Sequence, residues 1–412
     1  MAADLGEAPR TSLITQLCGD AHLANFGLFA SPERSVIFDL NDFDETAPGP
    51  FEWDVARLAT SFLLACRENG FAPRKADDVT RQAVSAYRDS MAEYATMNEL
   101  DIWYSRVNAN SLSTVARAKV TVEAQTLFSQ GLRAALQRDR WSAVRKLTVA
   151  TQEGRRFIQD PPLLIPLGID SVWRDGLQTS ITQYRESLIW DRQVLMNRYH
   201  IVDLAHKVVG VGSVGLRAFV LLLQGRDQND LLVLQAKEAV ASVLEQYTGI
   251  PAGEQHHGER VVRGQRLMQA ASDIFLGSTS GPRGRDYYIR QLRDMKWSPD
   301  ISTMSPGSMK SLAASCGQAL ARAHARGGDA IAIASYLGSA STFDDALIAF
   351  SRRYADQVAT DYALFQQALA SGRINAASDE TAAVADSLLV SVAPTLATTT
   401  AHQSPSDLPL QP

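Results

Sequence analysis

The order of apolar and polar positions predicts a β-hairpin near the start of the chain. Two apolar runs, SLITQLCGDAHLANFGLFAS at 12–31 and SVIFDLNDFDE at 35–45, flank a short turn that begins at Pro32. Apolar runs around a polar turn are typical of paired antiparallel strands. We expect the Ala-Pro-Gly-Pro stretch at 47–50 to break this β structure, because Pro and Gly interrupt regular elements.

A helical pattern begins at Glu52. Apolar side chains then recur at steps of three and four residues, at Val55, Leu58, Ala59, Phe62 and Leu63. This spacing places them on one face of a helix. The pattern continues with interruptions to about residue 140, and a second helical stretch is predicted over about 171–198.

A β-rich block starts at His200. Three apolar runs lie between 200 and 239, separated by a glycine-rich turn at 210–215 and by the polar turn GRDQND at 225–230. The remaining predicted elements are a helix near 258–272, a strand over 286–292, and helices from 307 onward, including 343–371 and 378–392. The end of the chain is rich in Thr, Ser and Pro and is expected to be disordered.

These blocks predict an α+β protein. We expect four parts: a hairpin with a helical block at 1–199, a β-rich block at 200–296, further helices at 297–394, and a disordered tail at 395–412. The composition agrees with a folded chain, because 45% of the 412 residues are hydrophobic and 21% are charged, which is a globular balance.

Charge and cysteine content exclude several classes of protein. A net charge of −5 argues against a general nucleic-acid-binding protein. The three cysteines are far apart and form no C-x-x-C pair, which excludes a zinc ribbon and a disulfide framework. The apolar runs fall far short of the ~18 residues that a membrane span needs, and the start lacks the features of a secretory signal. We therefore expect a cytoplasmic protein with neither a membrane nor a nucleic acid as partner.

Acidic and amide side chains gather in the first 54 residues. Asp20 and Asn25 stand five residues apart in GDAHLAN, and Asp39, Asp42 and Asp44 end the second apolar run. Phosphoryl transfer uses a carboxylate to orient or deprotonate the attacking hydroxyl, and amide and carboxylate oxygens to hold Mg²⁺. The segment therefore predicts a phosphoryl-transfer site. The alternative is that these acids only decorate a hairpin end.

A glycine-rich turn forms the second group. The sequence G-x-G-x-x-G at 210–215 lies between two apolar runs. Glycines of this kind let backbone N–H groups approach phosphates. The apolar run that follows, 216–223, looks like a strand, which favours a kinase-type glycine loop over a Rossmann turn, where a helix would follow. An ordinary β-turn is the alternative.

A lysine follows the next apolar run. Lys237 ends LLVLQAK and is one of only seven lysines in the chain. The run resembles the V-A-I-K strand of kinases, whose lysine contacts nucleotide phosphates and pairs with a glutamate. Among the glutamates that follow, we choose Glu245 as this partner, because it lies on the first helical stretch after the strand. The alternative is an ordinary lysine at a strand end.

Together these motifs resemble the aminoglycoside phosphotransferase and choline kinase branch of the protein-kinase-like superfamily. That branch has H-G-D-x-H-x-x-N, a strand ending in Asp, a G-x-P turn, and Asp-Leu-Ala at the start of a helix. The corresponding text here is CGDAHLANFG…DFDETAPGPFEWDVARLA, with Cys18 in place of the usual His. With Asp54 as the helix-start residue, the metal-binding position falls on Asp42, with Asp44 two residues on. Asp39 is the rival for that role.

The resemblance implies a role for each motif residue. Asp20 would orient or deprotonate the acceptor hydroxyl, His22 would position the catalytic loop or bind metal, and Asp54 would brace the loop, although it could equally be a plain helix-start acid. The other implied residues are the Mg²⁺ ligands Asn25, Asp42 and Asp44, the phosphate contact Lys237, and the nucleotide loop residues Gly210, Gly212, Ser213 and Gly215.

The order of these motifs is reversed relative to ordinary kinases, in which the glycine loop and lysine precede the catalytic loop. A circular permutation explains this order, since the termini of a domain are often close together. We therefore predict a permuted, two-lobed kinase-like fold with a small antiparallel sheet lobe and a larger helical lobe. The helix at 311–327 contains LARAHA, which resembles the family's L-A-x-x-H-A helix, and is expected beside the catalytic loop.

The whole chain also resembles the bacterial domain-of-unknown-function family 2252. The phrases that carry this resemblance are CGDAHLANFG, FDLNDFDE, PGPFEWDVARLA, KVVGVGSVGLRAFVLLLQG, LQAKEA, GQRLMQAASDIFLG and YYIRQLRDMK. Family members have a further segment before the equivalent of MAADL, which implies that an N-terminal portion is missing or that Met1 is an internal start. The resemblance brings no established activity.

The predicted function is an ATP- and Mg²⁺-dependent phosphotransferase with a small-molecule acceptor that the sequence does not identify. Two alternatives remain open. One is a metal-dependent hydrolase that uses Asp20, His22 and the acids at 39–44. The other is a nucleotide-binding, pseudokinase-like regulator without turnover.

Overall fold

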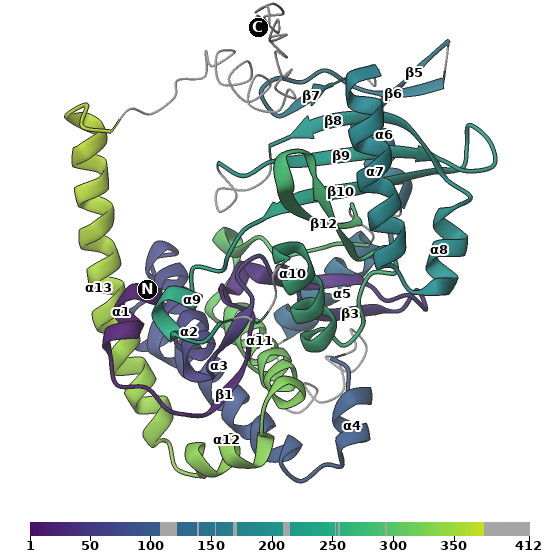
Figure 1. Ribbon diagram of the computed structural model, residues 1–412. Helices are drawn as coiled ribbons and strands as arrows, with labels where there is room; N and C mark the ends of the chain where they lie inside the picture. Colours follow the sequence, from purple (N-terminus) through teal and green to yellow (C-terminus); the bar gives the residue numbers. More distant parts are fainter. Residues whose placement is uncertain are drawn as a thin grey trace, which may run out of the picture.

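The fold is described from a computed structural model (Figure 1). It describes residues 1–107, 122–137, 140–152, 154–167, 171–208, 215–251, 253, 256–292 and 295–374. Gly210, Gly212, Ser213, the predicted helix over 378–392 and the predicted disordered tail lie outside these residues.

A six-stranded antiparallel sheet forms one side of the molecule. Its strands, in spatial order, are β7 (Leu164–Pro166), β8 (His200–Lys207), β9 (Ala218–Gln224), β10 (Leu231–Ala239), β12 (Arg285–Gln291) and β11 (Gly277–Gly281). The single antiparallel sheet predicted for 200–292 is confirmed. A strand and not a helix follows Gly215, so the chain has no Rossmann turn there.

Three two-stranded sheets complete the β structure of the described residues. The predicted hairpin is confirmed as β2 (Phe26–Ala30) and β3 (Val36–Leu40). The expected break at 47–50 was wrong, because Ala47–Pro50 forms strand β4, antiparallel to β1 (Ile14–Leu17). Two prolines are tolerated because β4 pairs on one side only, so their missing N–H groups can face away from the ladder. The third pair is β5 (Thr148–Thr151) with β6 (Gly154–Phe157).

Helices make up the rest of the regular structure (Figure 1). In the first half of the chain they are α1 (Ala2–Glu7), α2 (Glu52–Glu68), α3 (Pro73–Tyr94), α4 (Glu99–Tyr104), α5 (Val122–Gln137), α6 (Arg140–Leu147), α7 (Ser171–Ser187) and α8 (Trp190–Met196). Those in the second half are α9 (Glu245–Thr248), α10 (His257–Met268), α11 (Pro306–Gly327), α12 (Ala330–Leu337) and α13 (Thr342–Ala370). The α+β class is confirmed.

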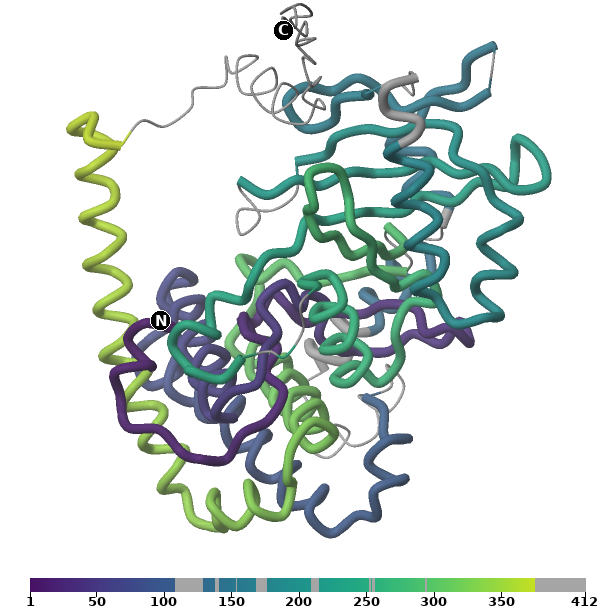
Figure 2. Tube along the Cα trace, in the orientation of Figure 1, coloured from purple at the N-terminus to yellow at the C-terminus, as the bar shows by residue number. Residues whose placement is uncertain are grey.

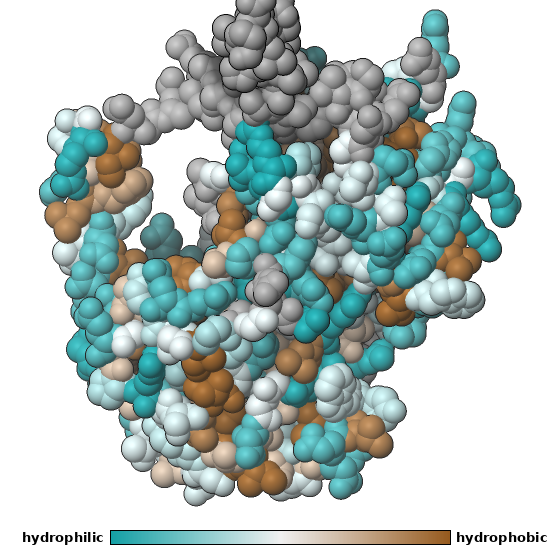
Figure 3. Space-filling view, in the orientation of Figure 1, coloured by the Kyte–Doolittle hydropathy of each residue, from teal (hydrophilic) through white to brown (hydrophobic). Residues whose placement is uncertain are grey.

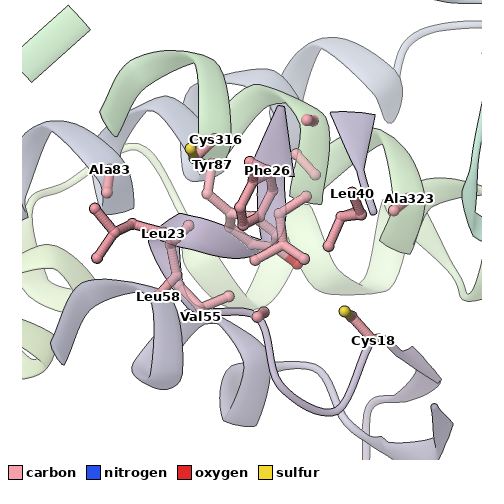
Figure 4. Close-up of a cluster of buried hydrophobic side chains, with 14 of the residues drawn as sticks. Cys18, Leu23, Phe26, Leu40, Val55, Leu58, Ala83, Tyr87, Cys316 and Ala323 are labelled. Carbon is pink, nitrogen blue, oxygen red and sulfur yellow. The ribbon is translucent and has the colours of Figure 1, made fainter. Parts of the chain in front are cut away.

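The largest hydrophobic core joins the first helices to the last ones. Side chains of the β2–β3 hairpin, α2, α3 and α11 meet in it, as Figure 4 shows for Phe26, Leu58, Tyr87 and Cys316. The contact between α3 and α11 is close, because a Cβ on Gly317 would lie 2.3 Å from the carbonyl oxygen of Ala83. Segments from opposite ends of the chain therefore build one helical body.

Two smaller hydrophobic cores cover the two faces of the sheet. Side chains of α7 and α8 pack on one face and those of α6 on the other. α6, α7 and α8 all precede residue 199, in the part of the chain that the sequence assigned to the helical lobe. Among the described residues, side chains from that part therefore pack in the cores of the sheet. The strands of the β2–β3 hairpin, in purple at the right of the tube view, lie between the sheet and the helical body (Figure 2).

A buried ion pair ties α11 to the hairpin. The Nη2 atom of Arg322 donates to Oδ1 and Oδ2 of Asp39 at 2.7 and 2.9 Å, and to the carbonyl of Met268 at 2.7 Å. Both charged residues are fully buried. Each therefore depends on the other for compensation, since removing one partner leaves an unpaired charge in the core.

The surface of the described residues is mixed in character. On the face shown in Figure 3, hydrophilic areas dominate and the brown areas are interrupted. Among the described helices, none combines the length and the apolar character that crossing a bilayer requires.

Replacing Arg322 with Ala should lower the free energy of unfolding by about 3–5 kcal/mol, because Asp39 would remain buried without its cation. The matched control is Arg352→Ala, which removes a surface pair with Asp77 and should cost about 1 kcal/mol or less. Urea unfolding followed by circular dichroism measures both. Equal losses for the two variants would contradict the structural importance of the buried pair.

Candidate functional site

Asp54 fixes the loop that follows β1. It lies in the first turn of α2 and accepts the backbone N–H groups of Cys18 at 2.6 Å and Gly19 at 3.1 Å. Gly19 has φ +91°, and a Cβ there would lie 2.1 Å from the carbonyl oxygen of Glu45. Glycine is therefore required at this position, and Asp54 holds the backbone of this loop with both of its carboxylate oxygens.

A buried chain of polar groups connects Asp54 to His324 on α11 and to Tyr87 on α3. The Nε2 atom of His324 lies 3.3 Å from Oδ2 of Asp54, and its Nδ1 lies 2.8 Å from the hydroxyl of Tyr87. Burial raises the pKa of Tyr87, and the charge of Asp54 raises it further. Tyr87 therefore stays protonated. Because a carboxylate oxygen only accepts, an N–H on Nε2 of His324 can donate to Asp54, while the Tyr87 hydroxyl pairs with Nδ1. The sequence placed α11 beside the loop but gave no role to Tyr87.

Asn25 links the loop to the acidic segment after β3. Its Nδ2 donates to the carbonyls of Asp20 at 3.2 Å and Asp42 at 2.9 Å. Its Oδ1 accepts the N–H groups of Asp42 at 2.7 Å and Asn41 at 3.3 Å. Both ends of the amide are engaged, so Asn25 organises the site here and offers no free oxygen to a metal.

Lys237 reaches these acids from the sheet. Its Nζ lies 3.2 Å from Oδ2 of Asp42 and 2.9 Å from Oδ2 of Asp44. Tyr288, which is opposite Lys237 in the β10–β12 register, donates its hydroxyl to Oδ1 of Asp44 at 2.5 Å. Lys237 and Asp42 are 195 residues apart in the sequence. The structure therefore brings Lys237 to two acids of the first motif, from a distant part of the sequence.

Two arginines hold the backbone of the acidic segment. Arg260, which is buried on α10, donates to the carbonyls of Thr46 at 2.6 Å and Asp44 at 2.8 Å, and also to that of Val240 at 2.7 Å. Arg290 on β12 donates to the carbonyl of Asn41 at 2.8 Å. Sequence reasoning missed both residues. For Arg260 the available signal was an arginine on the apolar face of a predicted helix.

The charge balance controls the ionisation of Asp42. Burial by itself raises the pKa of this carboxyl, but the positive charges of Lys237 and Arg290 outweigh that effect and lower the pKa to about 2. Asp42 is therefore an anion over the physiological pH range.

Asp20 lies at the exposed edge of the site. Its Oδ1 accepts from Nε of Arg57 at 2.8 Å, and its Oδ2 lies 3.6 Å from Nε2 of His22. Burial lowers the pKa of His22, against the opposing effect of Asp20. His22 is therefore mainly neutral near pH 7.

Asp39 and Glu245, two other residues predicted for the site, make different contacts. Asp39, the rival metal ligand, uses its carboxylate for Arg322 and for the N–H groups of Ala270 and Leu40. Glu245 accepts the N–H of Ser242. Among the described residues, the ion-pair partners of Lys237 are Asp42 and Asp44, not Glu245. Of the glycine-loop residues only Gly215 is described, with φ +92° in the turn before β9.

Comparison with known proteins gives a family. The family model described as "Uncharacterized protein conserved in bacteria (DUF2252)" matches residues 1–368. This chain belongs to the DUF2252 family. No curated protein matches the chain, and no solved structure matches it.

The acids of this DUF2252 protein suit Mg²⁺ in their chemistry. Within the described ranges, no three His, Cys, Asp or Glu side chains gather into a metal centre. Mg²⁺, however, is commonly held by one or two carboxylates together with water and substrate phosphates. Asp42 and Asp44 provide two such carboxylates, both partly exposed. The pair fits this mode of binding, whereas Asn25 does not in the arrangement observed.

Replacing Lys237 with Met should raise the pKa of Asp42 from about 2, because the nearest cation is lost. Carboxyl ¹³C NMR of labelled protein measures the change directly. Lys310→Met, at an exposed position on α11, is the matched control and should leave the Asp42 titration as it is. An unchanged Asp42 pKa in Lys237→Met would contradict the assigned charge balance.

The ion pair between Lys237 and Asp42 predicts that the stability of this DUF2252 protein depends on pH. The folded-state pKa of Asp42 lies below the ordinary value of 3.8, so its contribution is complete above about pH 4 and is lost as the pH falls toward 2. Lys237→Met should lose stability at neutral pH and little near pH 2, as measured by urea unfolding at each pH. A loss that did not depend on pH would argue against this linkage.

Proposed function

We propose that this DUF2252 protein is an ATP- and Mg²⁺-dependent phosphotransferase with a circularly permuted kinase-like fold, acting on a small-molecule acceptor. The observation that carries the proposal is the contact of Lys237 with Asp42 and Asp44. A sheet lysine thereby faces two carboxylates beside a loop braced by Asp54. Phosphoryl transfer depends on this combination of a cation for phosphates and oxygen ligands for a metal.

The proposed division of roles follows from the contacts of each side chain. Asp42 and Asp44 would hold Mg²⁺, which when bound neutralises phosphate charge. Lys237 would bind the nucleotide phosphates. Asp20, whose carboxylate is partly exposed and oriented by Arg57, would accept the proton of the acceptor hydroxyl. Tyr288 and Arg260 would keep the acidic segment in place when Lys237 changes partners.

The arrangement of the elements supports the kinase-like part of the proposal. The antiparallel sheet carries Lys237, and the helical body carries the braced loop, as in a two-lobed enzyme with its site between the lobes. The last large helices, α11 and α13, pack against α2 and α3 near the start of the chain. Proximity of early and late segments is what a circular permutation requires.

Mg²⁺–ATP should raise the melting temperature of the protein, because a ligand that binds only the native state stabilises it by about 2.7 kcal/mol at 100 times its Kd. Asp42→Asn should remove most of the Mg²⁺-dependent shift, since it discards a charged oxygen ligand. Asp39→Asn is the internal comparison and should change stability without changing the shift. No shift with Mg²⁺–ATP in folded wild-type protein would count against the proposal.

Asp20→Asn should keep Mg²⁺–ATP binding and lose transfer of the γ-phosphoryl group, by about 10²-fold or more, because it removes the general base. Transfer of ³²P from ATP into a small-molecule extract measures this loss, and the Asp101→Asn variant, at an exposed position on α4, is the control.

Two outcomes separate the proposal from its rivals, one in Lys237→Met and one in the wild type. Lys237→Met should abolish transfer by a phosphotransferase but leave a metal-dependent hydrolase largely active on phosphate esters. Tight Mg²⁺–ATP binding with no transfer in the wild type would instead indicate a nucleotide-binding regulator. The cytoplasmic location stays a prediction.

A further inference from the structure

The ammonium group of Lys237 occupies the space between two carboxylates. Its Nζ lies 3.4 and 3.2 Å from Oδ1 and Oδ2 of Asp42, and 2.9 Å from Oδ2 of Asp44. The side chain of Lys237 is 9% exposed, whereas those of Asp42 and Asp44 are 44% and 31% exposed. The lysine is therefore nearly buried, while the two acids that it contacts remain accessible from solvent.

A divalent cation bound to both acids would need the position that the ammonium group has. Mg²⁺ binds oxygen ligands at about 2.0–2.1 Å, so an ion shared by Oδ2 of Asp42 and Oδ2 of Asp44 would lie between these two atoms. The Nζ of Lys237 is already within hydrogen-bond distance of both. Positive charges at such short range repel each other. The lysine and a metal ion therefore exclude each other at this pair of carboxylates.

The two acids have further contacts that do not involve Lys237. The Tyr288 hydroxyl donates to Oδ1 of Asp44 at 2.5 Å, and the backbone N–H of Phe43 donates to Oδ1 of Asp42 at 3.1 Å. These contacts keep the carboxylates in position when the ammonium group leaves. A metal ion can then take its place without a rearrangement of the acidic segment.

Nucleotide phosphates would compete with the two acids for the same lysine. Phosphate oxygens form strong, charge-assisted hydrogen bonds with an ammonium group. A phosphate that binds Lys237 frees Asp42 and Asp44 for a metal, and a metal at the acids frees Lys237 for a phosphate. Because each ligand favours the state that the other requires, the two affinities are coupled, and the coupling is reciprocal.

We propose that Lys237 holds the place of the divalent cation in the nucleotide-free protein, so that metal binds weakly until nucleotide phosphates draw the ammonium group away from Asp42 and Asp44. The part that concerns nucleotide rests on the proposed function, to which it adds a regulation of the same site: metal and nucleotide bind together. The exclusion of metal by the lysine rests on the observed contacts alone, so it is testable without nucleotide.

Mn²⁺ without nucleotide is the probe, because carboxylate ligands suit Mn²⁺ as well as Mg²⁺. The electron paramagnetic resonance signal of free Mn²⁺ measures its binding to the full chain. Lys237→Met and Lys237→Gln should each bind Mn²⁺ about tenfold more tightly than the wild type, or better, because the charge that repels the metal is gone. Lys237→Arg keeps that charge and should bind Mn²⁺ as weakly as the wild type.

Two control variants locate the gained affinity. Lys237→Met combined with Asp42→Asn should lose the gain, because one of the two charged ligands is removed. Lys310→Met, at an exposed position on α11, should bind Mn²⁺ like the wild type. Melting curves verify that each variant is folded. A gain that persists in the double variant would overturn the placement of the metal at Asp42.

The outcomes distinguish this inference from the proposed function. Folded Lys237→Met and Lys237→Gln variants that bind Mn²⁺ no more tightly than the wild type would overturn the inference, even where Mg²⁺–ATP stabilises the wild type and so supports the proposed function. A gain in Mn²⁺ affinity without any stabilisation by Mg²⁺–ATP would support the exclusion of metal by Lys237, and would overturn both the proposed function and the coupling to nucleotide.

Discussion

The contact of Lys237 with Asp42 and Asp44 is the interaction on which the rest of the site depends. Three charges meet where the sheet faces the segment after the hairpin. Two carboxylates held this close would repel each other and resist burial without a cation between them. Lys237 supplies a positive charge beside the two carboxylates. Arg260 and Arg290 donate hydrogen bonds to backbone carbonyls of the same segment. The acidic segment is therefore held in a defined shape before any ligand arrives.

The other polar groups of the site extend this constraint into the helical body. Asn25 connects the acidic segment to the loop at Asp20, and Asp54 connects that loop to α2. His324 then connects Asp54 to α11. Because these groups are buried and hydrogen-bonded to one another, moving one would leave others unsatisfied, which is costly in a low-dielectric interior. Rigid placement of charged groups is what a site for phosphoryl transfer requires.

The sequence predicted those parts of the fold that depend on local patterns. The hairpin, the antiparallel sheet and the helices after Glu52 and Pro306 follow from periodicity. Motif resemblance singled out Lys237 and Asp42 for one nucleotide site, but it did not predict that the two side chains contact each other directly. Strand β4 was missed, because its prolines forbid a central strand but not an edge strand. Glu245 was chosen because it follows Lys237 in the chain. The carboxylates that Lys237 contacts, Asp42 and Asp44, are instead distant from it in the sequence. Tyr87 and Arg260 could not be assigned, since an isolated polar residue on an apolar helix face does not reveal which distant group it contacts.

We propose that a metal–nucleotide complex binds where Lys237 faces Asp42 and Asp44. The most direct test is paramagnetic relaxation by Mn²⁺ and ATP in protein labelled with ¹⁵N only at lysine, because the chain has just seven lysines. Lys310, on α11, lies 14 residues before His324, which is about 21 Å along a helix, and serves as the distant reference. We expect that the Lys237 amide loses most of its intensity while Lys310 is less affected, and that excess Mg²⁺ reverses the loss. Broadening that spares Lys237, or that affects Lys310 more strongly, would contradict it.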